Sequence, residues 1–191
     1  MQKPINKNAT RQACQLLQRL CTVAGKKIIT GQHTQTVAME EIGYIFEKTG
    51  QKPLLRGFEL LSYSPNINEK DAGQACLKEV YENHHTLEQA LKWALDTQGI
   101  VTMTFHWFSP IGGRDKSFYT ENTDFDPLKI LEPDTPERKA FFRDMDVIAR
   151  HLRTFQQAGI PILWRPFHEA EGAWFWWGSK GPEVARELYK L

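Results

Sequence analysis

Apolar residues recur at helical spacing in four separate segments of the chain. Residues three and four positions apart lie on one face of a helix, so such a pattern predicts an amphipathic helix packed against a core. The pattern is clear in three of the segments and weaker in the second. The predicted helices include residues 13–23, 37–48, 87–95 and 141–152.

A glycine follows each of these segments and directly precedes a short apolar run. The glycines are Gly25, Gly50, Gly99 and Gly159. Glycine adopts positive φ without a steric penalty from Cβ, and it therefore often ends a helix. A strand that begins soon after a helix end is typical of an α/β protein. The sequence thus predicts strands within residues 26–30, 51–60, 100–105 and 160–164.

Three helix starts are also visible in the sequence. Thr86 with Gln89 has the spacing of a capping box, which satisfies free N–H groups at a helix N-terminus. Thr135 precedes Pro136, and Pro182 opens the last segment. Proline is favoured in the first turn of a helix, where its missing N–H has no cost. Helices and strands are therefore expected to alternate along the chain.

Repeated strand–helix units imply parallel strands joined by right-handed crossovers, either in an open doubly wound sheet or in a (β/α)8 TIM barrel. The sequence has no G-x-G-x-x-G or G-x-x-x-x-G-K-[ST] motif, which disfavours a nucleotide-binding sheet. Functional residues of barrels follow the strand ends. The unusual residues of this chain do so, namely 31–33, Glu59, His106 with Trp107, and 165–178.

A complete barrel needs about 250 residues, and this sequence of 191 residues supplies four predicted strands. We therefore expect an α/β fold, a (β/α)8 barrel of which residues 1–191 form the first four βα units. On this reading the chain is one partial catalytic domain, truncated after the fourth strand.

Charge and composition exclude several classes of protein. The formal net charge is +1, so no basic surface indicates a nucleic-acid partner. No run approaches the roughly 20 apolar residues that span a membrane. Three cysteines give no even disulfide framework, and Cys14 and Cys21 are two helical turns apart, too far to pair.

The segment WRPFHEAEGAWFWWG, residues 164–178, concentrates the candidate chemistry. Glu169 follows His168 and is surrounded by aromatic residues, and an apolar setting would raise its pKa and make it a general acid. An isolated glutamate in a loop is more often a surface residue, but the position after a strand favours function. The indoles of Trp174, Trp176 and Trp177 offer flat faces for the C–H faces of sugars. One of the three is expected in the core, because adjacent side chains cannot all point into one site.

Two other chemistries lack their sequence patterns. The chain has no H-x-x-x-H or paired C-x-x-C spacing for zinc, although His84, His85, His106 and His168 are present. It has no G-x-S-x-G motif for a serine nucleophile. The residues alone therefore favour a carbohydrate-active protein in which Glu169 is the acid/base and no metal or cofactor is needed.

These residues also resemble a known family. The pattern R-P-x-H-E followed by G-x-W-F-W-W-G is similar to the acid/base segment of glycoside hydrolase family 26, the β-mannanase family. The resemblance extends to His106 and Trp107 and to PLLRGFELLSYSPN at residues 53–66. It covers most of this chain but only half of such a domain, which in this family is a (β/α)8 barrel with catalytic glutamates on strands 4 and 7.

The resemblance implies roles for individual residues. Glu169 matches the acid/base, and His168 and His106 match histidines that line the subsite beside the cleaved bond. Trp174 matches an aromatic residue that flanks this subsite, and Arg165 would orient the acid/base region. Trp107, beside the His106 position, is expected to bind the substrate together with His106, His168, Trp174 and Arg165. The family more often has aspartate where this chain has Glu59, and the strand that carries its nucleophile has no counterpart in residues 1–191.

The resemblance implies a retaining endo-β-1,4-mannanase that cleaves mannan, galactomannan or glucomannan. Two alternatives stay open: hydrolysis of β-1,3-xylan or mixed-linkage β-glucan, and a half-barrel that binds glycans without catalysis. An intracellular enzyme of another chemistry would need a phosphate loop or metal cluster. We expect a β-mannan-type polysaccharide or oligosaccharide as the partner, with no nucleic acid, membrane or cofactor. We also expect a monomer when full length and a secreted, periplasmic or cell-surface location.

Overall fold

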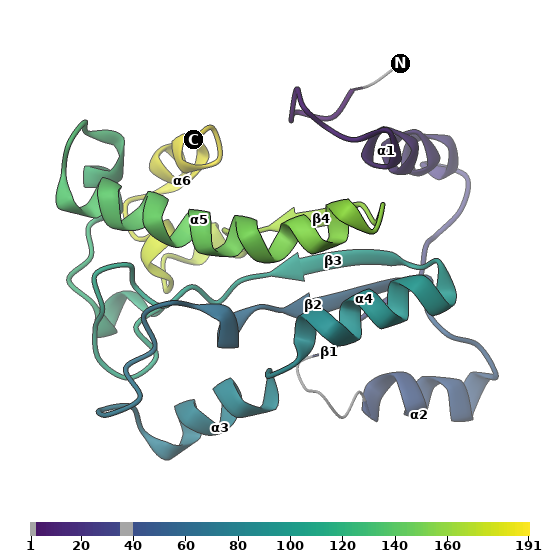
Figure 1. The fold of residues 1–191 in the computed structure, drawn as a ribbon, viewed down its shortest axis with the longest axis horizontal. Coiled ribbons are helices and arrows are strands. Elements are labelled where there is room, and N and C mark those ends of the chain that lie inside the picture. Colours follow the sequence, from purple (N-terminus) through teal and green to yellow (C-terminus); the bar gives the residue numbers. More distant parts are fainter. Residues whose placement is uncertain (1–2, 35–39) are drawn as a thin grey trace. The chain divides into compact units, whose positions relative to one another are not determined.

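The computed structural model describes residues 3–34 and 40–191. The chain divides into two compact units, each with its own internal contacts. Unit 1 contains Met1–Phe58, His85–Met103 and His151–Trp164, and unit 2 contains Glu59–His84, Thr104–Arg150 and Arg165–Leu191. Figure 1 traces the alternating strands and helices along the chain.

The sheet has the strand order β1-β2-β3-β4. Its strands are β1 (Gly31–Thr34), β2 (Leu55–Glu59), β3 (Ile100–Thr104) and β4 (Ile162–Arg165). β1 and β2 are parallel, with Gly31 opposite Leu55 and Thr34 opposite Phe58. Sequential strand order with helical connections confirms the predicted first units of a (β/α)8 barrel. β1 starts later than the predicted residues 26–30, because pairing with β2 begins at Gly31 and Ile28 is exposed.

The predicted helices are present, and one more is found. They are α1 (Arg11–Val23), α2 (Glu40–Thr49), α4 (Thr86–Thr97) and α5 (Pro136–Gln157), with α6 (Pro182–Leu188) in the last segment. The predicted start of the second helix at residue 37 lies outside the described residues. The additional helix, α3 (Gln74–Glu82), buries only Cys76 and Val80, so its apolar pattern in the sequence is short.

Three of the four glycines end helices as predicted. Gly25, Gly50 and Gly159 have φ values of 73°, 66° and 72°. The prediction for Gly99 is wrong, because Gln98 takes the left-handed conformation with φ 54° after α4. Gly99 instead lies against Trp93, whose ring a Cβ at this position would overlap. Glycine is thus required there by packing.

The predicted helix starts have mixed outcomes. The backbone N–H of Arg138 donates to Thr135 Oγ1 at 3.2 Å, which confirms Thr135 as the cap of α5. The predicted capping box at Thr86 is wrong. Residue His85, with φ 61°, is the N-cap of α4, and its side chain makes no capping hydrogen bond. Thr86 is instead the first residue of the helix and is buried.

The core of unit 2 is largely aromatic. The fully or almost fully buried rings include Trp107, Phe108, Phe118, Phe141, Phe167, Phe175, Trp176 and Trp177. One polar residue of α5, Asp144, is completely buried among them and accepts hydrogen bonds from Trp107 Nε1 at 3.0 Å and Asn66 Nδ2 at 2.6 Å. This carboxylate therefore joins α5 to the segments that follow β2 and β3.

Candidate active site

The candidate site is built from residues at and after the ends of three strands. Glu59 is the last residue of β2, and His106 follows β3 after a single intervening residue. His168 and Glu169 follow β4 after Pro166 and Phe167. All four belong to unit 2. The carboxyl ends of parallel strands lie at one edge of a sheet, which is where barrel enzymes place their catalytic groups.

Glu59 is buried, with 4% of its surface exposed. Its Oε2 accepts hydrogen bonds from Thr104 Oγ1 at 2.6 Å and from His106 Nδ1 at 2.9 Å, and its Oε1 accepts one from the His106 backbone N–H at 2.8 Å. Burial by itself would raise the pKa of this carboxyl, but these hydrogen bonds and the charge of His106 outweigh it and lower the pKa to about 2. Glu59 is therefore ionised at neutral pH.

His106 and His168 form a close pair. Their Nε2 atoms are 3.3 Å apart, and their rings meet at 77°. Burial would lower the pKa of His106, but the hydrogen bond and the charge of Glu59 raise it. Burial, together with the positive charge of His106, lowers the pKa of His168 to about 4. His168 is therefore neutral near neutral pH, and the pKa of His106 is shifted in the opposite direction.

Glu169 has a left-handed backbone conformation, with φ 54°. Its charge acts on both His106 and His168, so the structure brings together the three residues that the strand ends predicted. The predicted apolar setting is wrong for the described residues, however, because the side chain of Glu169 is exposed. The tryptophans of the segment do not desolvate it here.

The aromatic residues of the segment divide into one surface ring and a buried group. Trp174 has 46% of its surface exposed, whereas Trp176 and Trp177 have none. Trp176 Nε1 donates to the Trp107 carbonyl at 2.7 Å, and Trp177 Nε1 donates to the His168 carbonyl at 2.9 Å. The sequence predicted one core ring among the three tryptophans, and the structure buries two, of which Trp177 contacts His168.

The prediction that Trp107 binds the substrate is wrong for its ring. Trp107 is fully buried, stacked on Phe105 and Phe141, and its Nε1 donates to Asp144. Its residue type and its position beside His106 suggested a sugar contact, but its ring packs among the buried aromatic residues of unit 2. Trp107 anchors the segment that carries His106.

The segments after β3 and β4 are hydrogen-bonded to each other. Tyr119 and Phe175 form an antiparallel bridge. Around it, the backbone N–H of Thr120 donates to the Trp174 carbonyl at 2.8 Å, and that of Trp176 donates to the Phe118 carbonyl at 3.1 Å. The exposed ring of Trp174 is therefore held by contacts on both sides of it in the chain.

Arg165, the last residue of β4, is exposed. Its charge contributes to the lowered pKa of His168, which places the guanidinium near the histidine pair. Its role in orienting Glu169 stays a prediction.

No group of three or more His, Cys, Asp or Glu side chains within residues 3–34 and 40–191 is arranged to hold a metal ion. In the same part of the chain, every helix is too short or too polar to cross a membrane.

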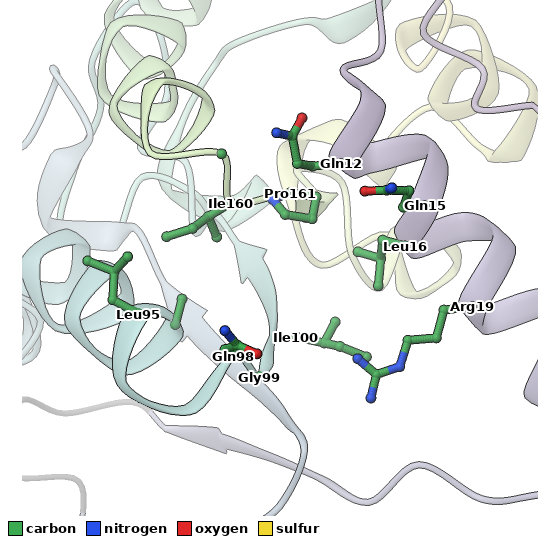
Figure 2. Close-up of a pocket in the computed structure, with 12 residues that line it drawn as sticks. Gln12, Gln15, Leu16, Arg19, Leu95, Gln98, Gly99, Ile100, Ile160 and Pro161 are labelled. Atoms are coloured by element: carbon green, nitrogen blue, oxygen red, sulfur yellow. The ribbon is translucent and has the colours of Figure 1, made fainter.

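A cavity of about 480 Å³ lies elsewhere, within unit 1. Figure 2 shows it between Leu16 and Arg19 of α1 and residues near the starts of β3 and β4, such as Ile100 and Pro161. Its lining includes no carboxylate and no histidine. Because it adjoins the amino ends of strands rather than the carboxyl ends, we do not assign it to the candidate site.

Comparison with known proteins decides the family. The family model described as glycosyl hydrolase family 26 matches residues 5–191. The chain belongs to glycosyl hydrolase family 26. The family 26 assignment agrees with the strand order and with the position of Glu169 after β4.

Individual relatives in family 26 agree with this assignment. A mannan endo-1,4-β-mannosidase of Thermothelomyces thermophilus is 37% identical, in a match that covers 97% of this chain and 37% of that protein. A β-mannanase from a symbiotic protist of the termite Reticulitermes speratus, solved with gluco-manno-oligosaccharide, is 29% identical with a TM-score of 0.81. That match covers 98% of this chain and 58% of the other.

A β-(1,4)-mannanase structure from Podospora anserina is 35% identical with a TM-score of 0.79, and the match covers 100% of this chain and 43% of that one. The chain spans between 30% and 37% of the length of the first three curated relatives. The family and the fold are thus shown for this chain, and the site residues lie within the matched region.

Proposed function

We propose that this chain carries the acid/base half of a retaining endo-β-1,4-mannanase. The observation that carries the proposal is Glu169, which directly follows His168 after β4 and whose charge acts on both histidines of the pair. Family membership and relatives named as mannan endo-1,4-β-mannosidases support it. On this proposal, residues 1–191 are the first four βα units of a larger catalytic barrel.

In the first step, protonated Glu169 donates its proton to the glycosidic oxygen while a second carboxylate attacks the anomeric carbon. The C–O bond to the leaving sugar breaks, and a glycosyl–enzyme bond forms. In the second step, Glu169 takes a proton from water, which attacks the same carbon and releases the carboxylate. Each step inverts the anomeric centre, so the overall result is retention.

The second carboxylate must lie about 5–5.5 Å from Glu169, across the sugar. Glu171 is only two residues away on the same segment and is also exposed. It cannot face Glu169 from the other side of the substrate, so we assign the nucleophile to a residue outside residues 1–191.

The proposed substrates are mannan, galactomannan and glucomannan. Two curated relatives carry names for β-1,4-mannan hydrolysis, and one solved relative was crystallised with a gluco-manno-oligosaccharide. His106, His168 and Arg165 are the proposed polar contacts to the sugar, and Trp174 the proposed apolar platform. β-1,3-Xylan and mixed-linkage β-glucan are the alternative substrates of the same site. We further propose that the full-length protein acts outside the cytoplasm, because a polysaccharide does not cross a cell membrane. We also propose that the full-length protein is a monomer.

The test is hydrolysis by the full-length protein of β-mannan, β-1,3-xylan and mixed-linkage β-glucan in parallel. We expect oligosaccharides from mannan, with the β-anomer formed first in a time course followed by ¹H NMR. Cleavage of only xylan or only mixed-linkage glucan would show that this polysaccharide, and not mannan, is the substrate. Binding of mannan without cleavage by the full-length protein would favour a glycan-binding module.

A further inference from the structure

The carboxylate of Glu59 is buried and engaged by three donors. Thr104 Oγ1 and His106 Nδ1 approach Oε2, and the backbone N–H of His106 approaches Oε1. An ionised carboxylate accepts hydrogen bonds and donates none. Nδ1 of His106 must therefore carry a proton, and the tautomer of His106 is determined by Glu59.

This constraint leaves two proton arrangements for the histidine pair. If His106 is neutral, its Nε2 is an acceptor, and His168 must donate through its own Nε2 across the 3.3 Å contact. If His106 is a cation, its Nε2–H donates to His168, and neutral His168 then carries its proton on Nδ1. The two arrangements make Nδ1 of His168 an acceptor or a donor, respectively.

Charge balance favours the cationic form of His106. A buried carboxylate without a positive partner is costly, and His106 contacts Glu59 directly. Two further acidic residues, Glu169 and Glu79, act on His106 in the same direction as Glu59. The positive charge of Arg165 acts instead on His168, where it disfavours a second histidine cation.

Nδ1 of His168 takes no part in the contact between the two rings and is the atom that could bind a ligand. His168 has 8% of its surface exposed, and its Nδ1 is buried without a hydrogen-bond partner among the residues that the structure describes. A buried donor of this kind is costly unless a ligand or another group accepts from it. His168 also directly precedes Glu169 in the chain.

We propose that Glu59 is a positioning residue that holds His106 as a cation through Nδ1, so that His168 is kept neutral with Nδ1–H as a hydrogen-bond donor beside Glu169. Glu59 acts through two intervening rings and does not itself touch the sugar. The consequence for hydrolysis rests on the proposed function: a sugar hydroxyl would accept from His168 Nδ1–H while Glu169 protonates the glycosidic oxygen. The protonation pattern itself does not depend on that function.

The test is ¹⁵N NMR of histidine-labelled full-length protein, with long-range correlations that distinguish protonated from unprotonated ring nitrogens. At about pH 7, which lies above the ordinary pKa of histidine, we expect both nitrogens of His106 to be protonated. Only Nδ1 of His168 is expected to carry a proton. A neutral His106, or a His168 protonated on Nε2, would overturn the proposal without any variant.

The variant Glu59→Gln removes the charge and keeps the size of the side chain. Because the His106 backbone N–H needs an acceptor, the amide oxygen should take the place of Oε1, and the amide NH₂ then faces Nδ1. We therefore expect His106 to lose the proton on Nδ1, with a fall in its pKa of about one unit or more. An unchanged His106 in a folded Glu59→Gln protein would overturn the proposal.

The matched control is Glu79→Gln. Glu79 also acts electrostatically on His106, but it is paired with Lys116 at 2.5 Å and its side chain is about half exposed. This variant should leave both nitrogens of His106 protonated at about pH 7. An equal effect of the two variants would show that general electrostatics, not the Glu59 contact, sets the charge of His106.

Hydrolysis is the second readout. In Glu59→Gln we expect kcat on mannan to fall roughly tenfold with a smaller change in KM, and the pH profile to shift with the His106 titration. If the wild-type protein shows the expected NMR pattern but cleaves no mannan, the proposed function fails and the proton arrangement stands. If mannan is cleaved while His106 is neutral, the positioning role fails and the function stands.

Discussion

Glu59 and His106 are 47 residues apart in the sequence, yet Oε2 of Glu59 lies 2.9 Å from Nδ1 of His106. The contact joins the end of β2 to the segment after β3, and both side chains are largely buried. It therefore makes the stability of the candidate site depend on pH.

The two groups contribute stability in overlapping pH ranges. The pKa of Glu59 is lowered from 4.5 to about 2, so its contribution is present above pH 4.5 and is lost as pH falls toward 2. The pKa of His106 is raised above 6.5, so its contribution is present below pH 6.5 and is lost as pH rises through the folded value. The free-energy difference between wild type and Glu59→Gln should therefore be largest between pH 4.5 and 6.5. Urea unfolding of the full-length proteins across this range measures it, and a difference independent of pH would contradict the prediction.

Glu169→Ala should remove most activity on polysaccharide, by roughly 10²- to 10⁴-fold, the usual contribution of a general acid or base. An aryl mannoside with a good leaving group needs little protonation, so its glycosylation step should be less affected. Pre-steady-state release of the aryl group measures that step. Glu171→Ala is the control on the same exposed segment and should behave like wild type. Equal losses of Glu169→Ala on both substrates would argue against the acid role.

The buried carboxyl of Asp144 should make stability depend on pH a second time, with a sign opposite to that of Glu59. Burial raises its pKa from 3.8 to about 6, against the lowering effect of the Trp107 hydrogen bond. The folded protein therefore loses stability as pH rises from 3.8 through about 6. Asp144→Asn keeps an oxygen for Trp107 and Asn66 and should remove this pH dependence. Asp144→Ala leaves both donors unpaired and should cost about 1–3 kcal/mol for each at every pH. Thermal unfolding at several pH values compares them.

Alanine substitutions of Trp174 and Trp176 should affect different properties, substrate binding in the first case and stability in the second. Trp174→Ala removes a half-exposed ring and should weaken mannan binding, seen as a higher KM, with little change in thermal stability. Trp176→Ala empties a fully buried site and should cost about 3–5 kcal/mol of stability. Calorimetry and kinetics on the two full-length variants separate the effects. Similar melting temperatures for both variants would contradict the assigned burial.

The sequence was sufficient for the order of the strands and of every helix except α3, because the signals are local. Helical spacing, the glycines at 25, 50 and 159, and the capping residue Thr135 each depend on neighbouring residues alone. The candidate site followed from one further rule, that parallel strands end at the same edge of a sheet. That rule predicted the proximity of His106, His168 and Glu169.

The remaining features depend on contacts between distant segments. Trp107, Trp174, Trp176 and Trp177 are alike in the sequence, and no periodicity in an irregular segment tells which ring faces the core. Thr104 was missed because a threonine at the end of a buried strand is also an ordinary strand residue. Asp144 lies on the apolar side of α5, where only its partners Trp107 and Asn66 explain a carboxylate.

The bridge between Tyr119 and Phe175 limits how segments of this site can be transplanted between members of the family. The segment that carries His106 and the segment that carries Trp174 share backbone hydrogen bonds, so neither can change length alone without moving the other. If the two segments bind the substrate as proposed, we expect them to determine substrate preference jointly. Transplanting both from one relative should transfer it, whereas transplanting either alone should break the hydrogen bonds that hold the surface tryptophan.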